Sequence, residues 1–157
     1  MPPSALASDT ERLRVDVGSL GEAALPMLPT ASSLWYVAGP FPGDKDNRVY
    51  EPEFGPEAGL DGGTRLDFAA RWGEKKDLMW RYDGRITETG RPVDFPVGRN
   101  AVFMAKYVYA PTARTLDISL GSDDAWKIYV NGKEVAGKFV ERGVMPDQDK
   151  ATVELQP

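Results

Sequence analysis

The sequence predicts an all-β protein, a two-sheet antiparallel β-sandwich of jelly-roll type. Sixteen Gly and thirteen Pro among 157 residues are typical of a chain broken by turns and not of a helical bundle. Apolar and aromatic residues occur in short runs between these turns, and none of the runs has the length and period of an amphipathic helix. Residues 122–135 contain a strand, a two-residue turn and a return strand. With 41% hydrophobic residues the chain is long enough for one core, so we expect one domain.

Composition divides the chain at about residue 34. Residues 1–33 are rich in Ala, Ser, Pro and Leu and are expected to form a linker or interdomain tail. The β-sandwich is expected over 34–157. Its first strand is predicted at 34–38, an aromatic and β-branched run. The Gly-Pro-Phe-Pro sequence at 39–42 is expected to end that strand, because proline cannot donate to a central ladder.

The next region is predicted to be dominated by loops. Residues 43–63 combine Gly, Pro, Asp and Glu at high density, and we expect a long surface loop pinned by the aromatic side chains of Tyr50 and Phe54. Loops of this length often carry function. Short strands are expected at 64–69, 78–82 and 93–95, with turns between them.

Residues 101–110 are predicted to form a central strand, because both faces of the alternating pattern are apolar except at Lys106. Residues 115–120 follow with a half-exposed pattern, apolar at every second position. Two short strands are expected near the end of the chain, at 138–140 and 151–155. Eight or nine short strands in total favour two packed antiparallel sheets.

The segment 122–135 carries the strongest pattern. Trp126, Ile128 and Val130 alternate with more polar positions, which is the period of a half-buried strand. Asn131-Gly132 is the dipeptide that best tolerates the positive φ angles of a type I′ hairpin turn. We therefore predict a hairpin with its turn at these two residues.

Charge and composition exclude several classes of function. The net charge of −5 and the isoelectric point near 4.8 disfavour a nucleic-acid partner, and Lys and Arg form no local cluster. The chain contains no His and no Cys, which removes imidazole bases, thiolate nucleophiles and His/Cys zinc sites. No apolar run has the length of a membrane span or of a signal-peptide core, so we expect no membrane insertion and no export signal within the chain.

Two segments resemble a known family. Trp35-Tyr-Val-Ala-Gly-Pro-Phe41 and the hairpin sequence at 121–133 resemble galactose-binding-like jelly rolls, which are accessory domains of large secreted bacterial proteins. The segment 142–150 is similar to a loop of multidomain proteins of planctomycete type, and the matches together run from about 35 to 155. The resemblance implies an extracytoplasmic or secreted module of a longer precursor, with neighbouring domains as partners.

The resemblance also implies a last strand, beginning Gly-x-Asn, beyond Gln156-Pro157. We therefore expect a domain fragment that lacks this strand. A sheet edge without its neighbour exposes unpaired backbone groups and invites pairing from another chain. Pairing through that edge is a hypothesis, and a monomer in light scattering at high concentration would contradict it.

The Ser-Asp-Asp lead-in to the hairpin is the first candidate site. It resembles that of protective-antigen-type sugar-binding domains, in which adjacent aspartates hold calcium and a sugar diol. In this chain Asp123 and Asp124 are followed by Ala125, where those domains usually have Gly. The alternative is that one aspartate caps the turn and the other faces solvent. Calcium is a possible ligand that would also need loop carbonyls or Asp147 and Asp149, and no cofactor is required.

Further side chains are candidates for sugar contacts. Arg142, Asp147 and Asp149 are expected to form a charged rim near the hairpin, and a loop held by local salt bridges is the alternative. An aromatic stacking platform would come from Trp72, Trp80, Tyr107 and Tyr109, with core packing as the alternative. Trp35 and Trp126 lie on predicted strands and are assigned to the core. The pair Asp147 and Asp149 also resembles glycosidase carboxylates, but paired acids are common on acidic surfaces.

These observations predict a non-catalytic carbohydrate-binding accessory module. The alternative is a structural or protein-interaction β-sandwich that has no ligand of its own. A carbohydrate-binding module is expected to show a polar cleft with an exposed aromatic side chain, whereas a structural module is expected to show an apolar patch that matches its neighbours.

Overall fold

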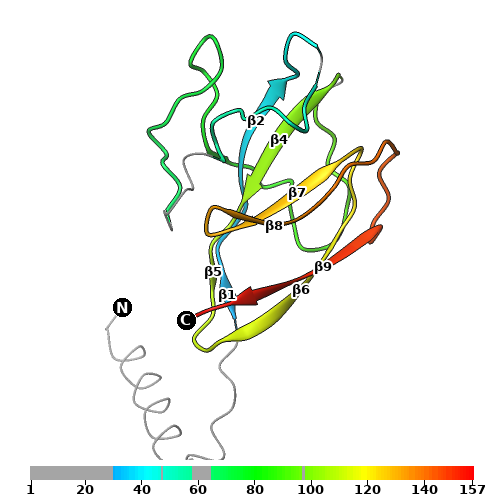
Figure 1. The fold of residues 1–157 in the computed structure, drawn as a ribbon. Coiled ribbons are helices and arrows are strands. Elements are labelled where there is room, and N and C mark those ends of the chain that lie inside the picture. The colour runs from blue at the N-terminus through cyan, green and yellow to red at the C-terminus, as the bar shows by residue number, and fades with distance from the viewer. Residues whose placement is uncertain (1–29, 47, 58–64, 97) are drawn as a thin grey trace, which may run out of the picture.

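The computed structural model describes residues 30–46, 48–57, 65–96 and 98–157, and in these residues all regular structure is β. The all-β prediction is confirmed for this part of the chain (Figure 1). The strands are β1 (Ala31–Ser32), β2 (Tyr36–Pro42), β3 (Arg81–Tyr82), β4 (Asn100–Ala105), β5 (Val108–Tyr109), β6 (Arg114–Leu120), β7 (Trp126–Val130), β8 (Lys133–Lys138) and β9 (Asp149–Leu155). Of the expected linker, 30–33 are described and include β1, and 1–29 lie outside the described residues.

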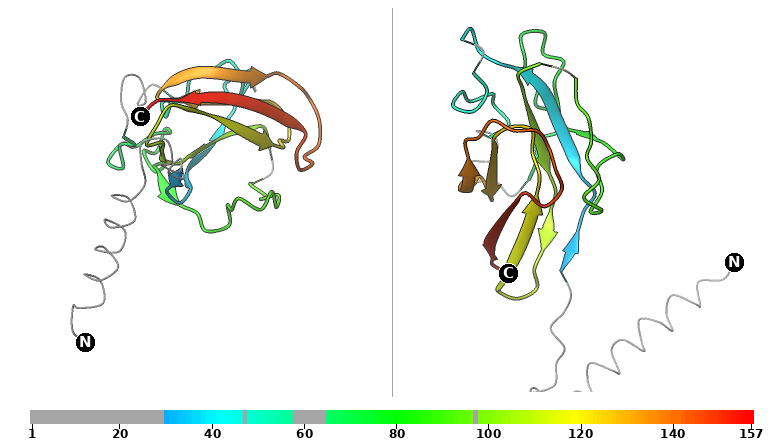
Figure 2. Two further views of the ribbon diagram at one scale, coloured as in Figure 1. Left: turned by 90° about the horizontal axis from the view of Figure 1, so that it is seen from below. Right: turned by 90° about the vertical axis from the view of Figure 1, so that its right-hand side faces the viewer.

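The strands of the described residues pair in four small antiparallel sheets: β1 with β5, β2 with both β3 and β4, β6 with β9, and β7 with β8. In the right-hand view of Figure 2, β2 and β4 lie on one side of the molecule, and the β7–β8 hairpin and β9 lie on the other. This arrangement resembles two layers, although hydrogen bonding does not join each layer into one continuous sheet. The jelly-roll connectivity stays a prediction.

Strand β2 is longer than predicted, because the Gly-Pro-Phe-Pro sequence does not end it. Phe41 pairs with Ala101 and Pro42 with Asn100, after a register shift between Ala38 and Phe41. Strand β3 pairs with β2 at Tyr36 and Val37, so among the described strands the proline end of β2 pairs with β4 alone. Proline is tolerated at such a bulged edge because no second ladder needs its missing N–H.

The principal core lies on one face of β2. Ala38, Phe41, Leu66 and Trp80 are buried there. Rings of partly buried residues surround them: Tyr36, Phe54, Trp72 and Phe103. The ring of Phe41 lies 5.5 Å from that of Phe54 and 5.4 Å from that of Phe103, in tilted and edge-on geometries. Val37 points to the other face and is fully buried, so β2 is covered on both faces.

The predicted central strand at 101–110 is two strands. Strand β4 pairs with β2, whereas β5 pairs with β1, and the break falls at Lys106 and Tyr107. The Lys106 ammonium pairs with Glu88 and lies 4.9 Å from the centre of the Trp35 ring. The one polar residue in the apolar run therefore marks the place where the chain changes sheets.

The second half of the chain follows the sequence pattern closely. Strand β6 pairs with β9 over seven residues each, without a register shift. Strands β7 and β8 form the predicted hairpin, and Asn131 and Gly132 both have positive φ, 50° and 81°. The predicted strand at 138–140 is wrong beyond Lys138, where β8 ends.

Among the shorter predicted strands, 65–69 and 93–95 form none in the structure, and residue 64 lies outside the described residues. The prediction at 78–82 is correct in part, since Arg81–Tyr82 is β3 and Leu78 forms an isolated bridge with Trp72. Trp72 and Leu78 flank a turn, and their contacts with the core fix this segment without a longer ladder.

A candidate ligand groove between a loop and a hairpin

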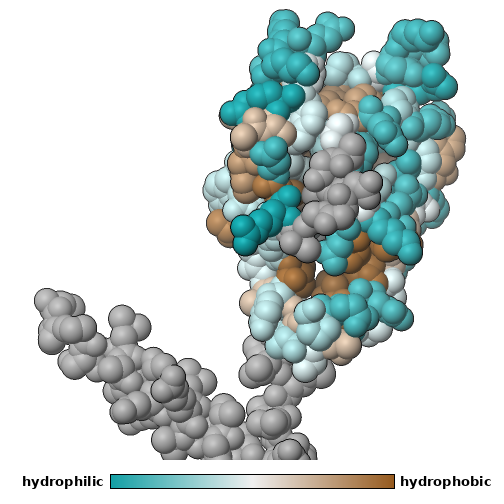
Figure 3. Space-filling view, turned by 60° about the vertical axis from the view of Figure 1, so that its left-hand side comes forward, coloured by the Kyte–Doolittle hydropathy of each residue, from teal (hydrophilic) through white to brown (hydrophobic). Residues whose placement is uncertain are grey.

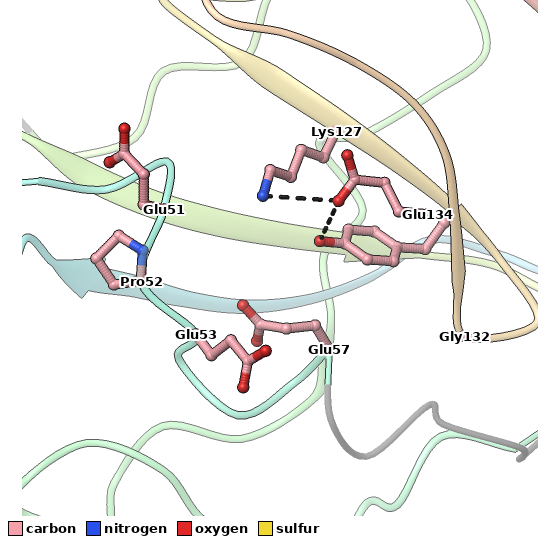
Figure 4. Close-up of a pocket in the computed structure, with 8 residues that line it drawn as sticks. Glu51, Pro52, Glu53, Glu57, Lys127, Gly132 and Glu134 are labelled. Carbon is pink, nitrogen blue, oxygen red and sulfur yellow. Dashed lines mark hydrogen bonds and ion pairs between the residues drawn. The ribbon is translucent and has the colours of Figure 1, made fainter.

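A groove of about 370 Å³ lies between the loop at 48–57 and the β7–β8 hairpin. Alternation in β7 directs Lys127 and Tyr129 to one face, and the hairpin register brings Glu134 opposite Tyr129. The loop supplies the other wall. Figure 4 shows the glutamates of the loop on one side and the hairpin side chains on the other. The lining consists of Glu51, Pro52, Glu53, Glu57, Lys127, Tyr129, Gly132 and Glu134.

Tyr50 attaches the loop to the hairpin. The Lys127 ammonium lies 4.5 Å from the centre of the Tyr50 ring, and the Phe139 ring packs edge-on to Tyr50 at 5.2 Å. Gly137 lies opposite Lys127, and a Cβ atom there would lie 3.0 Å from the Tyr50 hydroxyl. Glycine thus permits the close approach of Tyr50. At the other end of the loop, Phe54 enters the core. The prediction of a loop pinned by these two aromatic residues is confirmed for the described part of that loop, 43–46 and 48–57.

The groove is polar and acidic. Four of its lining residues are glutamates and one, Lys127, is a cation. The Lys127 Nζ atom lies 3.6 Å from Glu134 Oε2, which also accepts a hydrogen bond of 3.4 Å from the Tyr129 hydroxyl. Glu57 accepts the backbone N–H groups of Phe54 and Gly55 at 3.1 and 2.9 Å, which holds the turn of the loop. Glu51 and Glu53 are exposed at the rim.

Tyr129 stays a neutral phenol throughout the physiological pH range. Burial, followed by the negative charges of Glu134 and Glu57, raises the pKa of Tyr129 to about 12. A neutral phenol both donates and accepts hydrogen bonds, whereas the carboxylates accept and the ammonium donates. The groove therefore offers both kinds of hydrogen-bonding group to a ligand.

Beside the groove, the Phe139 side chain is 68% exposed. Its ring is positioned by Tyr50, which also contacts the groove residue Lys127. Phe139 follows the last residue of β8, and both Phe139 and Gly137 lie beside the Tyr50 ring. A flat apolar surface thus adjoins the polar groove.

The predicted charged rim forms a structural clamp around Asp149. This carboxylate accepts hydrogen bonds from Trp126 Nε1 at 2.8 Å and from Lys138 Nζ at 2.7 Å, and it is also paired with Arg142. These donors belong to β7, to β8 and to the connection that follows β8. The clamp therefore joins the hairpin to the start of β9. Its hydrogen bonds from Lys138 and Arg142 hold the pKa of Asp149 well below its usual value.

Arg142 also contacts the lead-in to the hairpin, a contact that the rim prediction did not include. Asp124 Oδ1 accepts the backbone N–H of Arg142 at 2.7 Å. The Arg142 guanidinium donates to the Ser122 hydroxyl at 2.9 Å and to the Ser122 carbonyl at 3.3 Å. These contacts agree with the alternative that Asp124 and Arg142 form local bonds within the protein. They hold the segment that leads into β7.

Asp123 is exposed, and no hydrogen bond or ion pair joins it to another described residue. Asp147 bonds to the Ser119 hydroxyl on β6. The structure thus places Asp147 and Asp149 in different contacts. Within the described part of the chain, no group of three or more acidic side chains is arranged to hold a metal ion. The calcium site stays a prediction that depends on backbone ligands.

Of the two tryptophans proposed for stacking, Trp80 lies in the core and Trp72 is partly buried and packs against it. Trp80 is 5% exposed, and its ring meets that of Trp72 edge-on at 6.0 Å. Trp80 therefore has no free face for a sugar ring, and the core alternative accounts for it. Tyr107 donates its backbone N–H to Ser33, and its hydroxyl bonds to the Leu66 N–H at 2.6 Å. Tyr109, on β5, is exposed.

Sequence reasoning missed the groove residues themselves. Glu51, Glu53 and Glu57 were visible as acidic positions in a loop expected to carry function, and Lys127 and Tyr129 as the outward positions of a strand. The available signal is the aromatic residue Tyr50, which is predicted to pin the loop but whose partner the sequence does not indicate. Its partner is the hairpin, and that contact forms the groove.

Comparisons with known proteins leave the family open. No protein-family model matches the chain, and the searches of curated proteins and of solved structures found no match. None of the described residues form a helix with the length and apolar character that a membrane crossing requires.

Proposed function

We propose that the protein is a non-catalytic carbohydrate-binding module and that the groove between the 48–57 loop and the β7–β8 hairpin holds the sugar. The observation that carries the proposal is the polar groove beside the exposed ring of Phe139. Sugar hydroxyls need both donors and acceptors, and Tyr129, Lys127 and Glu134 supply both. The apolar C–H side of a pyranose suits the face of an exposed aromatic ring.

The jelly-roll resemblance of the sequence supports the same proposal. Accessory domains of this type act outside the cytoplasm as parts of longer proteins, and we propose that context here. Binding at one small, open groove is expected to be weak, and repeated modules in a longer protein would raise the avidity.

The charge of the groove sets the class of sugar. Glu51, Glu53, Glu57 and Glu134 outnumber the single cation Lys127, so a uronic acid or a sulfated sugar would meet like charges. We expect neutral or amine-bearing glycans to bind about tenfold more tightly than acidic glycans of the same size at low salt. Titration calorimetry with a neutral oligosaccharide and its uronic-acid counterpart checks this. Equal affinity, or a preference for the acidic sugar, would contradict the assignment of the groove.

A glycan array with the intact chain identifies the ligand, and matched variants locate it. Tyr129→Phe removes one hydroxyl from the groove and is expected to weaken binding about fivefold, the loss that follows from one hydrogen bond of about 1 kcal/mol. Tyr109→Phe removes a hydroxyl from an exposed ring on β5 and is the control, which should bind as the unchanged protein does. Equal effects of the two substitutions would place the site elsewhere.

The array is repeated with calcium, with a chelator, and on a variant that combines Asp123→Ala with Asp124→Ala. A site in the groove binds under all three conditions, because its side chains bond to the ligand directly. Loss of binding with chelator and in the double variant would show that the sugar binds at Asp123 and Asp124 through calcium and not in the groove.

A structural module is the second candidate, since Leu34, Tyr109 and Met145 are large apolar side chains with most of their surface exposed. Figure 3 shows one face on which hydrophilic residues cover much of the described surface and hydrophobic residues are exposed in separate areas. A domain that packs permanently against a neighbour needs one contiguous apolar patch, and separate apolar areas do not provide it. Absence of binding to every glycan, with or without calcium, would favour this candidate.

A further inference from the structure

Among the described residues, strand β9 has one partnered edge and one unpartnered edge. It pairs with β6 from Asp149 to Leu155, and no other strand of the described residues pairs with it. In the right-hand view of Figure 2, β9 lies at the margin of the lower part of the molecule with β6 on its inner side. An edge of seven residues presents a row of N–H and C=O groups that another strand can pair with.

The sequence of β9 lacks two of the features that protect such edges. It contains no proline, and its register with β6 has no bulge. Its side chains alternate, so that Val153 is buried at 4% exposure while Lys150, Thr152 and Glu154 are exposed on the opposite face. Thr152 bonds to Asp117 on β6 at 2.7 Å, but no ion pair joins Lys150 or Glu154 to another described residue.

The exposed side chains of β9 are complementary in charge to those of a second, antiparallel copy of β9. We propose that the free edge of β9 pairs antiparallel with the same edge of a second copy of this chain, centred on Thr152. This register places Lys150 of each copy opposite Glu154 of the other, and Thr152 opposite Thr152. It also places Ala151 opposite Val153 on the inner face. Both Lys150–Glu154 pairs form in this one register, and all seven residues of β9 pair with the second copy.

The contact is isologous and closes after two copies. It joins the two-stranded β6–β9 sheets into one four-stranded sheet, in which both copies of β9 are central. An interface of this kind uses backbone hydrogen bonds for affinity and the side-chain pairs for register. It involves none of the residues that line the groove, so it does not depend on the proposed function.

Sedimentation equilibrium over a concentration series tests the proposal. We expect the average mass of the unchanged protein to rise toward twice that of one chain. Lys150→Glu places two glutamates opposite each other at both ends of the contact, and Glu154→Lys does the same with two lysines. Each substitution is expected to raise the dissociation constant about tenfold or more.

An equimolar mixture of the two variants gives the decisive result. One copy then contributes two glutamates and the other two lysines, so both pairs are again attractive and association should return. Lys133→Glu makes the same change of charge at an exposed position of β8 and should leave the dissociation constant unchanged. A monomer at millimolar concentration, or a dimer that Lys150→Glu leaves intact, would overturn the proposal, as would a mixture that fails to associate.

Discussion

Replacing Trp80 by Ala is expected to lower the free energy of unfolding by about 3–5 kcal/mol, the usual cost of removing a buried tryptophan. Trp80 is 5% exposed and contacts the ring of Trp72, which in turn packs against Phe41. Removal of the indole would leave a cavity beside several rings that cannot all move inward. The loss would therefore include both the transfer of apolar surface from water and the cost of the cavity.

Urea unfolding followed by tryptophan fluorescence or circular dichroism measures this change. Tyr109→Ala is a suitable control, because it removes an aromatic ring that is 66% exposed on β5 and should change the free energy of unfolding by less than about 1 kcal/mol. Similar effects of the two substitutions would show that Trp80 is not in a packed core. Trp80 would then again be a candidate for stacking against a sugar ring.

Asp149→Asn is expected to lower the thermal midpoint at neutral pH by several degrees. The substitution keeps the shape of the side chain and an acceptor for Trp126 Nε1, but it removes the charge that holds Lys138 and Arg142. Those cations then lie together without their counter-charge. Asp123→Asn removes a neighbouring exposed carboxylate that bonds to no other described residue and should leave the midpoint unchanged.

The clamp also predicts a dependence on pH. Because the pKa of Asp149 is lower in the folded chain than its usual value of 3.8, the folded state binds fewer protons at this site than the unfolded state. The stabilisation is fully present well above pH 3.8 and is lost as the pH falls through the folded-state pKa. Thermal unfolding at several pH values should therefore show the two proteins converging in strong acid. A constant difference down to the lowest pH would contradict the role of the Asp149 charge.

From residue 114 onward, local patterns in the sequence predicted most of the strands, except that β8 ends at Lys138. The alternation of Trp126, Ile128 and Val130 and the Asn131-Gly132 turn depend on neighbours along the chain, and the hairpin has that form. The failures involve contacts with distant segments. The prolines after Ala38 are accommodated because β2 has only one partner there, and the run at 101–110 divides where Lys106 meets Glu88 and Trp35.

The candidate site likewise depends on contacts between distant segments, which local sequence patterns do not predict. Asp123 and Asp124 are candidates because they are adjacent in sequence, yet the described carboxylate with the most charged partners is Asp149, about 25 residues away. The groove combines a loop and a hairpin that lie far apart in the chain. Nothing in the spacing of Glu57 and Glu134 indicates that they face one space, since the docking of Tyr50 brings them together.

The most direct test of the groove is an NMR titration of the intact, isotope-labelled chain with a neutral oligosaccharide selected from the glycan array. We expect the largest shifts at the amides of Lys127, Tyr129 and Glu134 and in the loop around Glu53, with little change at Asp123 and Asp124. In the Tyr129→Phe variant the same amides should shift only at several-fold higher sugar concentration. Shifts confined to the lead-in at 122–124, or the absence of shifts from the loop and the hairpin with a sugar that binds, would contradict a carbohydrate site in the groove.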